Sequence, residues 1–436
     1  NILFGVIIFC YYDMSIAVII SIIYVYIHNY VMSLNDDLIP VTILSGSLGA
    51  GKTTTLNHIL SREQELNAAV LVNDMGEVNV DADLVERESD LTQNDDEIIE
   101  MSNGCICCRL RGDMLDEVGR LANERDFEYL LVESSGISEP IPVAQTFARG
   151  FEDAEFDPTG VYELDTMVSV VDAHSFWKGF DSGQALTDDT IDPQGNRVPE
   201  EALMDQIEFC DVLLLNKCDL VPDDELEEIE AVLSTLQPRA KIIRTEHGAI
   251  DPGEIIDTDL FDFKWASQSA GWKRELQGGH HHGAAAEEHG VTSFVFDSDR
   301  PFHPERIARL FTDLPDGIVR AKGFFWSAGR EDIAMGLDKA GQSVRAGPKG
   351  TWIATLPKAQ QQRYFAARPA IKEQWDDQWG DRGSQLVFIG RKLDQQALVE
   401  QLESCVLSDA EMGEDWNEYP DPFTADEQRE LALADD

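Results

Sequence analysis

The residues best suited to chemistry lie between Gly46 and Thr53. They read GSLGAGKT and fit the phosphate-binding pattern G-x-x-x-x-G-K-[ST] at every position. Glycines let backbone N–H groups converge on phosphate oxygens, Lys52 supplies a positive charge to the β- and γ-phosphates, and the Thr53 hydroxyl is suited to Mg²⁺. The candidate nucleotide-binding residues of this loop are Gly46, Gly49, Ala50, Gly51, Lys52, Thr53 and Thr54.

A carboxylate follows the apolar run YLLV at residues 129–132. Glu133 would stand at the tip of a strand next to the P-loop strand, where an acid can orient water or belong to the Mg²⁺ site. Gly136, three residues later, would bring a backbone N–H near the γ-phosphate. We therefore take Lys52 and Glu133 as catalytic candidates and Gly136 as a nucleotide-binding one.

The run DVLLL at residues 211–215 is followed by Asn216-Lys217-Cys218-Asp219, an N-K-x-D pattern. The Asp219 carboxylate can accept hydrogen bonds from the ring N–H and the exocyclic amine of guanine. Adenine offers no such pair of donors. The pattern therefore predicts GTP as the nucleotide.

Three thiols occur within four residues, at Cys105, Cys107 and Cys108. Adjacent side chains of an extended segment point apart, so these thiols cannot all be core packing. Thiolates favour Zn²⁺ and Cu(I) and also bind Co²⁺, and three of them leave a fourth position open for another ligand or for handing the metal on. A redox-active cysteine pair and inert buried thiols are the alternatives.

Between the P-loop and these thiols, residues 72–81 read VNDMGEVNVD, the place of a switch loop that responds to the γ-phosphate. Asp74 is a candidate for positioning the attacking water, and Glu77 for ligating the metal; a plain polar loop is the alternative. A switch residue that shared the thiol-bound metal would couple nucleotide state to metal affinity.

A second metal-binding pattern is the stretch His280-His281-His282, with His289 nearby. Neutral imidazoles suit Zn²⁺ and Co²⁺. The flanking glycines and alanines indicate a flexible segment, so this is either a metal-collecting arm or a solvated linker.

These residues need elements to position them. Apolar runs predict strands near 40–45, 68–73, 97–101, 128–133, 166–171, 211–216 and 240–244, with helical patterns such as 113–122 and 223–236 between them. Alternating strands and helices predict a mostly parallel sheet covered on both faces, here an α/β P-loop G domain. Strands at 292–296, 317–326, 352–356 and 386–389, with helices beginning at 304 and 394, predict a smaller α+β domain that recognises a partner or closes over the nucleotide.

The expected domain order is a hydrophobic extension (1–31), a P-loop domain (32–245), a His-containing linker (246–290), a C-terminal domain (291–405) and an acidic, solvated tail (406–436). The extension is apolar but contains Asp13 and has no flanking Lys or Arg, and Met32 begins a natural-looking start. We interpret it as an upstream extension, with a membrane anchor as the alternative, and expect no stable membrane association.

The chain of 436 residues carries 82 acidic against 34 basic side chains, a formal net charge of -48. Such a surface repels a phosphate backbone and argues against a nucleic-acid partner. The acid runs along the whole chain after residue 35, which favours salt adaptation over acidic tails on an ordinary domain. Seven scattered or clustered cysteines are no disulfide framework and suit a reducing cytoplasm.

Taken together, GSLGAGKTT, VNDMGEVNVD, GCICC, ESSGISEP and NKCD in this order resemble the CobW-type GTPases, which include zinc-regulated GTPase metalloprotein activators and cobalt- or iron-linked relatives. The resemblance runs from about residue 39 to 219 and continues from 290 to about 405. It implies Mg²⁺-dependent GTP hydrolysis, Zn²⁺ (or Co²⁺ or Fe²⁺) at the Cys-x-Cys-Cys motif, and delivery of that metal to a client metalloenzyme.

Carried over by position, the resemblance assigns guanine recognition to Asn216, Lys217 and Asp219, metal binding to the three cysteines, and a switch ligand to Glu77. The family switch reads closer to Asn-Glu-Phe-Gly, whereas residues 73–76 here read Asn-Asp-Met-Gly, which leaves the role of Asp74 open. The function expected is a GTP-hydrolysing metallochaperone. A metal- or redox-responsive GTP-binding switch without delivery is the alternative, and a homo-oligomer stays open.

Overall fold

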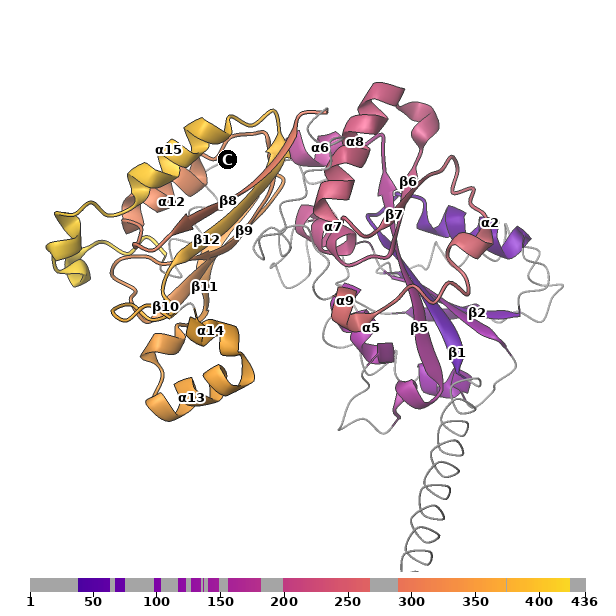
Figure 1. The fold of residues 1–436 in the computed structure, drawn as a ribbon. Helices are drawn as coiled ribbons and strands as arrows, with labels where there is room; N and C mark the ends of the chain where they lie inside the picture. Colours follow the sequence, from indigo (N-terminus) through magenta and orange to yellow (C-terminus); the bar gives the residue numbers. More distant parts are fainter. Residues whose placement is uncertain are drawn as a thin grey trace, which may run out of the picture.

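The computed structural model describes eleven parts of the chain, and everything below refers to these residues. They are 38–62, 67–74, 98–102, 117–122, 127–134, 136, 140–148, 156–181, 199–266, 289–373 and 375–423. Two sheets, each with its own helices, make up this part of the protein (Figure 1).

The N-terminal sheet has seven parallel strands in the order β3-β2-β4-β1-β5-β6-β7. Its central strands are apolar on both faces because helices cover both. The predicted strands are all confirmed, as β1 (Ile39–Gly46), β2 (Ala68–Asp74), β3 (Ile98–Ser102), β4 (Tyr129–Glu133), β5 (Tyr162–Asp172), β6 (Val212–Asn216) and β7 (Lys241–Arg244).

Helices cover both faces of this sheet. One face packs on α5, on the helical residues 117–122 and, nearer β6, on α7 and α8, while the other packs on α2 and residues 250–256. The G-domain helices are α2 (Lys52–Arg62), α5 (Pro140–Ala148), α6 (Phe176–Asp181), α7 (Pro199–Glu208), α8 (Asp223–Leu236) and α9 (Phe263–Ala266). The predicted α/β P-loop architecture is therefore confirmed.

The smaller domain is an antiparallel five-stranded sheet in the order β11-β10-β9-β12-β8, with α12 and α15 packed on one face (Figure 1). Its strands are β8 (Val291–Ser298), β9 (Ile318–Phe325), β10 (Ile333–Ala340), β11 (Ser343–Thr351) and β12 (Ser384–Arg391). Its helices are α12 (Pro304–Thr312), α13 (Lys358–Ala367), α14 (Pro369–Glu373) and α15 (Gln395–Cys405).

Two expectations for this domain are wrong. Residues 352–356 form no strand: the turn η5 (Ile353–Thr355) is held there because the Asp381 carboxylate accepts hydrogen bonds from the backbone N–H groups of Ile353 and Ala354, each at 2.8 Å. Residues 406–423 are no solvated tail. They pack on the domain through Leu407, Trp416 and Phe423, which are 1%, 6% and 2% exposed.

The segment expected as a linker begins with residues that pack on the G domain. Ile250 and Ile255 belong to the apolar cluster under α2, and Phe261 and Phe263 pack beside Phe209. The hydrophobic extension expected at residues 1–31 and the metal-collecting stretch expected at residues 280–282 lie outside the described residues. Within the described part of the chain, no helix has both the length and the apolar character that a membrane crossing needs.

The two domains share an apolar core. Val319, Ala340 and Ile389, on the sheet face away from α12 and α15, join a cluster with Leu203, Ile207 and other residues of α7 and α8. At its edge the Arg391 guanidinium lies 3.9 Å from the ring centre of Trp177 on α6 and 3.2 Å from a Glu228 carboxylate oxygen on α8. The second domain therefore contacts three helices of the first.

A fully buried arginine lies within this interface. The Arg320 side chain, on β9, is 1% exposed and donates at 2.6 Å both to Glu208 Oε1 on α7 and to Asp338 Oδ1 on β10. Burial acts to raise the pKa of Asp338, but the charges of Arg320 and Lys322 outweigh it and lower the pKa of that carboxyl. A charge this deep is tolerated because carboxylates of both domains neutralise it.

Replacing this arginine tests how much a buried ion pair contributes to stability compared with an exposed one. Arg320→Ala leaves the Glu208 carboxylate buried without its 2.6 Å partner, so we expect a loss of about 3–5 kcal/mol in the free energy of unfolding. Urea denaturation of the full chain measures it.

The matched control is Lys322→Ala, which removes a cation 3.3 Å from the same Asp338 where both side chains are 24% exposed. We expect it to cost less than about 1 kcal/mol. Equal losses in the two variants would show that burial of Arg320 does not hold the domains together.

Candidate functional site

The candidate site lies along one edge of the seven-stranded sheet. All its strands are parallel, so their carboxyl ends meet at that edge, where ligands of open α/β sheets bind. The P-loop follows β1, Glu133 ends β4, Asp172 ends β5, and the N-K-x-D segment begins at the end of β6. The topology thus gathers motifs that are far apart in the sequence, such as Ala50 and Asn216, which are separated by 166 residues.

The P-loop has a conformation that its sequence requires. Gly46 has φ +142°, and a Cβ there would lie 2.3 Å from the carbonyl oxygen of Val170 on β5, so only glycine fits beside that strand. The loop ends where α2 begins at Lys52. This residue is 6% exposed, and its ammonium donates to the carbonyl oxygens of Gly46 at 3.0 Å and Ser47 at 3.3 Å. A positive charge and a helix N-terminus therefore share one phosphate-sized loop.

The structure brings the side chains of Thr53 and Glu133 together. The Thr53 hydroxyl donates to Glu133 Oε1 at 3.1 Å, and Glu133 is 2% exposed at the end of β4. A hydroxyl and a carboxylate at this spacing are oxygen donors of the kind that Mg²⁺ prefers, so the residues fit that ion. Bound there, Mg²⁺ would neutralise charge on the phosphates.

Gly136 lies against the P-loop and is linked to α7. A Cβ on Gly136 would stand 2.7 Å from the backbone nitrogen of Leu48. Its carbonyl oxygen accepts a hydrogen bond from Gln206 Nε2 at 3.3 Å, and Gln206 is fully buried. Two residues later in the same helix, Glu208 binds Arg320 of the second domain. The loop next to the phosphate site is therefore connected to the other domain through a single helix.

Asn216 joins three loops. Its amide nitrogen donates to the Ala50 carbonyl in the P-loop at 2.9 Å, and its amide oxygen accepts from the Thr245 hydroxyl and the Gly248 N–H, both at 3.0 Å. Asn216 is 2% exposed. The first residue of N-K-x-D thus fixes the base-side loops to the phosphate-side loop.

Lys217 and Asp219 point differently. Lys217 has φ +64°, and its ammonium lies 2.7 Å from Asp172 Oδ2. Asp172 also accepts from the backbone N–H groups of His174 and Ser175. The Asp219 side chain remains 30% exposed, 4.0 Å from the ring of His247, and so keeps a carboxylate available for a base. Burial raises the pKa of the intervening Cys218 thiol, which favours its neutral form and disfavours metal binding.

Several predicted site residues lie outside the described part of the chain. They are Glu77, Cys105, Cys107, Cys108, His280, His281 and His282. Asp74 is described by its backbone alone: it ends β2 and pairs with Ser102, the last residue of β3. Thr54 is exposed and Gly49 stands in open space, while Ala50 is fully buried. No group of three His, Cys, Asp or Glu side chains arranged for a metal occurs among the residues the structure describes.

The structure adds site residues that sequence reasoning missed. Asp172 binds Lys217, Thr245 and Gly248 bind Asn216, and Gln206 binds Gly136. Asp172 and Thr245 could have been found, because both follow predicted strands at the same sheet edge. The contact of Gln206 could not be predicted, because nothing in the sequence of its helix indicates a hydrogen bond to Gly136, 70 residues away.

A P-loop followed by an N-K-x-D segment at one edge of a parallel sheet defines a P-loop nucleotide-binding protein. Comparison with known families gives the finer class: residues 40–244 match the nucleotide-binding domain of CobW/HypB/UreG, and residues 291–406 match the cobalamin synthesis protein cobW C-terminal domain. The chain belongs to the CobW family and is a GTPase.

Relatives cover most of both chains. The sequence is 40% identical over 408 residues to zinc-regulated GTPase metalloprotein activator 1 of Dictyostelium discoideum, covering 90% of this chain and 85% of the relative. It is 28% identical over 371 residues to the zinc chaperone YjiA of Escherichia coli, and the alignment covers 83% of this chain and 96% of the relative. A crystal structure of Zn(II)-bound YjiA GTPase from E. coli aligns with 21% identity and a TM-score of 0.38 over 85% of this chain and 99% of that one.

Two glycines of the P-loop should respond differently to a methyl group. A Cβ on Gly51 would stand 2.3 Å from Asn216 Nδ2, whereas a Cβ on Gly49 meets no atom within 4 Å, although both have positive φ. We expect Gly49→Ala to lower the free energy of unfolding by about 1–2 kcal/mol, from backbone strain alone. Gly51→Ala should also break the Asn216 contact with the P-loop. We therefore expect it to bind GTP about tenfold more weakly than Gly49→Ala does, a difference of about 1.4 kcal/mol in binding free energy.

Titration with a fluorescent GTP analogue, beside thermal unfolding, measures the two variants. If Gly51→Ala binds GTP as well as Gly49→Ala does, the Asn216 link between the loops is not needed for the site.

Proposed function

We propose that this GTPase is a metallochaperone, which takes a zinc-type ion at Cys105, Cys107 and Cys108 and delivers it to a client metalloprotein. One observation carries the proposal. Asp74 of the expected switch pairs with Ser102, three residues before Cys105, while Val72 pairs with Glu133 at the nucleotide site. The strand leading to the thiols therefore ends at the same sheet edge as the GTP site.

The names of relatives support this reading. The Dictyostelium protein is described as zinc-regulated and as a metalloprotein activator, and the E. coli and Sinorhizobium relatives as zinc chaperones. We therefore put Zn²⁺ first among the candidate cargo ions, with Co²⁺ and Fe²⁺ after it. Glu77 is proposed as a further ligand from the switch, and the His280–His282 stretch as a metal-collecting arm.

The residues of the GTP site then have separate tasks. Lys52, the P-loop amides and Gly136 would hold the phosphates, and Thr53 with Glu133 would hold Mg²⁺. Asp219 would read guanine, positioned by Asn216 and Lys217. Asp74 is proposed to orient the attacking water.

Movement of the C-terminal domain would follow from the contacts of α7. Loss of the γ-phosphate alters the surroundings of Gly136, and Gln206 passes that change to the helix that holds Arg320. We propose that GTP hydrolysis repositions the second domain and releases the cargo. The proposed units remain 32–245, 246–290 and 291–405, and we place the protein in the cytoplasm, acting on a client protein rather than on nucleic acid.

The test measures GTP hydrolysis at buffered free Zn²⁺ and Co²⁺ in high salt. We expect metal to change kcat/KM of the wild type about fivefold or more, the lower range of coupling between two sites, and Cys107→Ala to abolish the response. Cys405→Ala, which removes a buried thiol of the C-terminal domain, is the matched control and should respond like the wild type.

A rate that ignores metal in all three proteins would contradict the coupling. If mild oxidant also removed two thiols reversibly while the metal content stayed unchanged, the redox-responsive switch would replace the metallochaperone as the better account.

A further inference from the structure

One stretch of this acidic chain reverses the sign of its charge. The protein has 82 acidic residues among 436, yet none occurs between Asp338 and Glu373. The same stretch carries a run of basic residues. They are Lys339, Arg345, Lys349, Lys358, Arg363, Arg368 and Lys372. Residues 343–372, which form β11, η5, α13 and most of α14, are called the basic segment below.

The charges of the basic segment face solvent. Arg345, Lys349 and the four basic residues of the α13–α14 hairpin, one of which lies between the two helices, are all exposed. Arg345 pairs with Glu201 of α7 at 2.8 Å. Within the described residues, Lys358, Arg363, Arg368 and Lys372 form no ion pair. Elsewhere, arginines such as Arg244, Arg306 and Arg330 each hold a carboxylate at 3.0 Å or less. In a chain so rich in carboxylates, four cations kept away from them are available to a partner.

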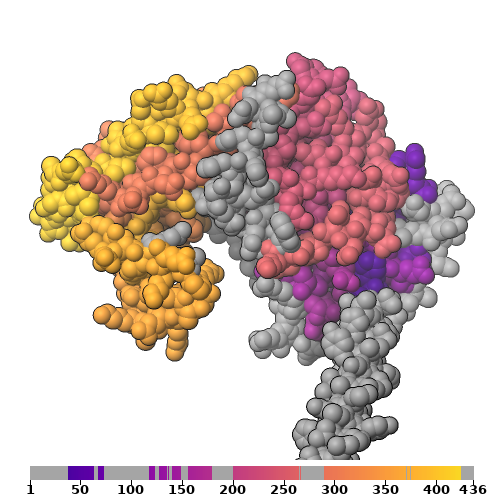
Figure 2. Space-filling view, in the orientation of Figure 1, coloured from indigo at the N-terminus to yellow at the C-terminus, as the bar shows by residue number. Residues whose placement is uncertain are grey.

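The helices that carry these charges project from the domain. Helices α13 and α14 stand clear of the five-stranded sheet at its lower end (Figure 1, Figure 2). No residue of α13 is buried, and Tyr364 is 45% exposed. The hairpin is held by Gln361, which donates to the carbonyls of Ala354 and Leu356, and by the ring contact of Phe365 with Trp375. A helix that buries nothing contributes little to the core, so its surface is free for another role.

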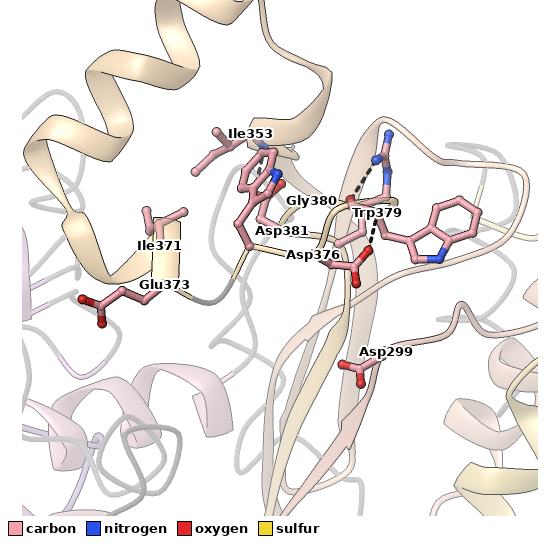
Figure 3. A pocket seen from close by; sticks show the side chains of 10 residues that line it. Asp299, Ile353, Ile371, Glu373, Asp376, Trp379, Gly380 and Asp381 are labelled. Atoms are coloured by element: carbon pink, nitrogen blue, oxygen red, sulfur yellow. Dashed lines mark hydrogen bonds between the residues drawn. The ribbon is translucent and has the colours of Figure 1, made fainter.

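A pocket at the foot of the hairpin marks where the basic surface ends (Figure 3). Its volume is about 530 Å³, and four carboxylates outnumber one cation, Arg382, in its lining. The carboxylates are those of Asp299, Glu373, Asp376 and Asp381. The Asp376 carboxylate accepts hydrogen bonds from the backbone N–H groups of Gln378 and Trp379 and so belongs to the local turn. This acidic lining would repel an anionic ligand, which leaves the outer face of the helices as the basic surface.

We propose that the outer face of α13–α14, with the Lys349 end of β11, is a docking surface for an acidic segment of a partner protein. Charge complementarity identifies the partner: four unpaired cations, with exposed Tyr364 among them, fit carboxylates. At physiological salt, exposed charges more than about 8 Å apart are largely screened from one another. A ligand bound on the projecting helices is therefore little affected by the negative charge on the rest of the chain.

The size of the surface favours a peptide segment over nucleic acid. Ten residues of α13 span about 15 Å, which matches four or five residues of an extended peptide. A phosphate backbone would run past the helices onto the acidic body and be repelled there. The proposal deepens the metallochaperone function, because the partner would be the client, and it rests on that function only for this identification.

The experiment uses the full chain and a fluorescent peptide of about five Asp/Glu residues, matched to the length of α13, that carries a photo-cross-linker. Anisotropy gives the Kd at low and high salt. Arg363→Glu, in the middle of α13, should weaken peptide binding about fivefold, the effect of exchanging an exposed attraction for a repulsion. Arg309→Glu, at an exposed position of α12 in the same domain, is the matched control with the same change of charge and should stay within about twofold.

Cross-links confined to residues 343–373, with binding that weakens in salt, would support the docking surface. Equal weakening by the two variants, or cross-links elsewhere, would overturn it. Tighter binding of an oligonucleotide than of the peptide would also overturn it and would make the surface one for nucleic acid. A wild-type dimer that Arg363→Glu dissociates would overturn it as well, because the occupant would then be a second copy of the chain.

Circular dichroism checks that both variants fold, and unchanged zinc-dependent GTP hydrolysis in Arg363→Glu separates this proposal from the metallochaperone function.

Discussion

The structure depends on a charge that is buried between its two domains. Arg320 lies in the shared apolar core, and removing it from water would be costly without Glu208 and Asp338, one from each domain. The arginine therefore does more than join two surfaces. It requires α7 to remain where its carboxylates can reach β9, and α7 is also the helix whose Gln206 holds the loop beside the phosphate site. Any movement at that loop must be accommodated by this buried pair.

In the candidate nucleotide site, a single buried side chain likewise links several loops. Asn216, in the N-K-x-D segment, holds the P-loop and the loop after β7 through hydrogen bonds of 2.9–3.0 Å. Because Gly51 lies directly against the Asn216 amide, which also donates to Ala50, the P-loop and the N-K-x-D segment are linked directly. A GTP molecule would thus meet a site whose two ends are already in register, which reduces the entropy lost on binding.

How much the sequence predicts depends on the kind of element. The strands of the parallel sheet are buried on both faces and appear as short apolar runs, so all seven were predicted. Strands β10 and β11 were missed because IAMGLDKA and SVRAGPKGT contain charged and glycine residues, and β11 is an edge strand whose apolar side chains Val344 and Ala346 are only partly buried. The acidic composition of residues 406–423 predicted a tail, but Leu407, Trp416 and Phe423 are spaced widely enough to bury without an obvious pattern. Motif loops were predicted with their chemistry, whereas Asp172, Thr245 and Gln206 act through contacts that only the fold creates.

The central claim is that GTP hydrolysis drives release of the metal. The direct measurement is a single-turnover stopped-flow experiment in which the zinc-loaded protein meets GTP, a non-hydrolysable analogue or GDP in the presence of a chromophoric chelator. The account predicts that zinc release follows phosphate formation with GTP and is slow with the analogue. Equal release rates with all three nucleotides would contradict it, because the metal would then leave without reference to the GTP cycle.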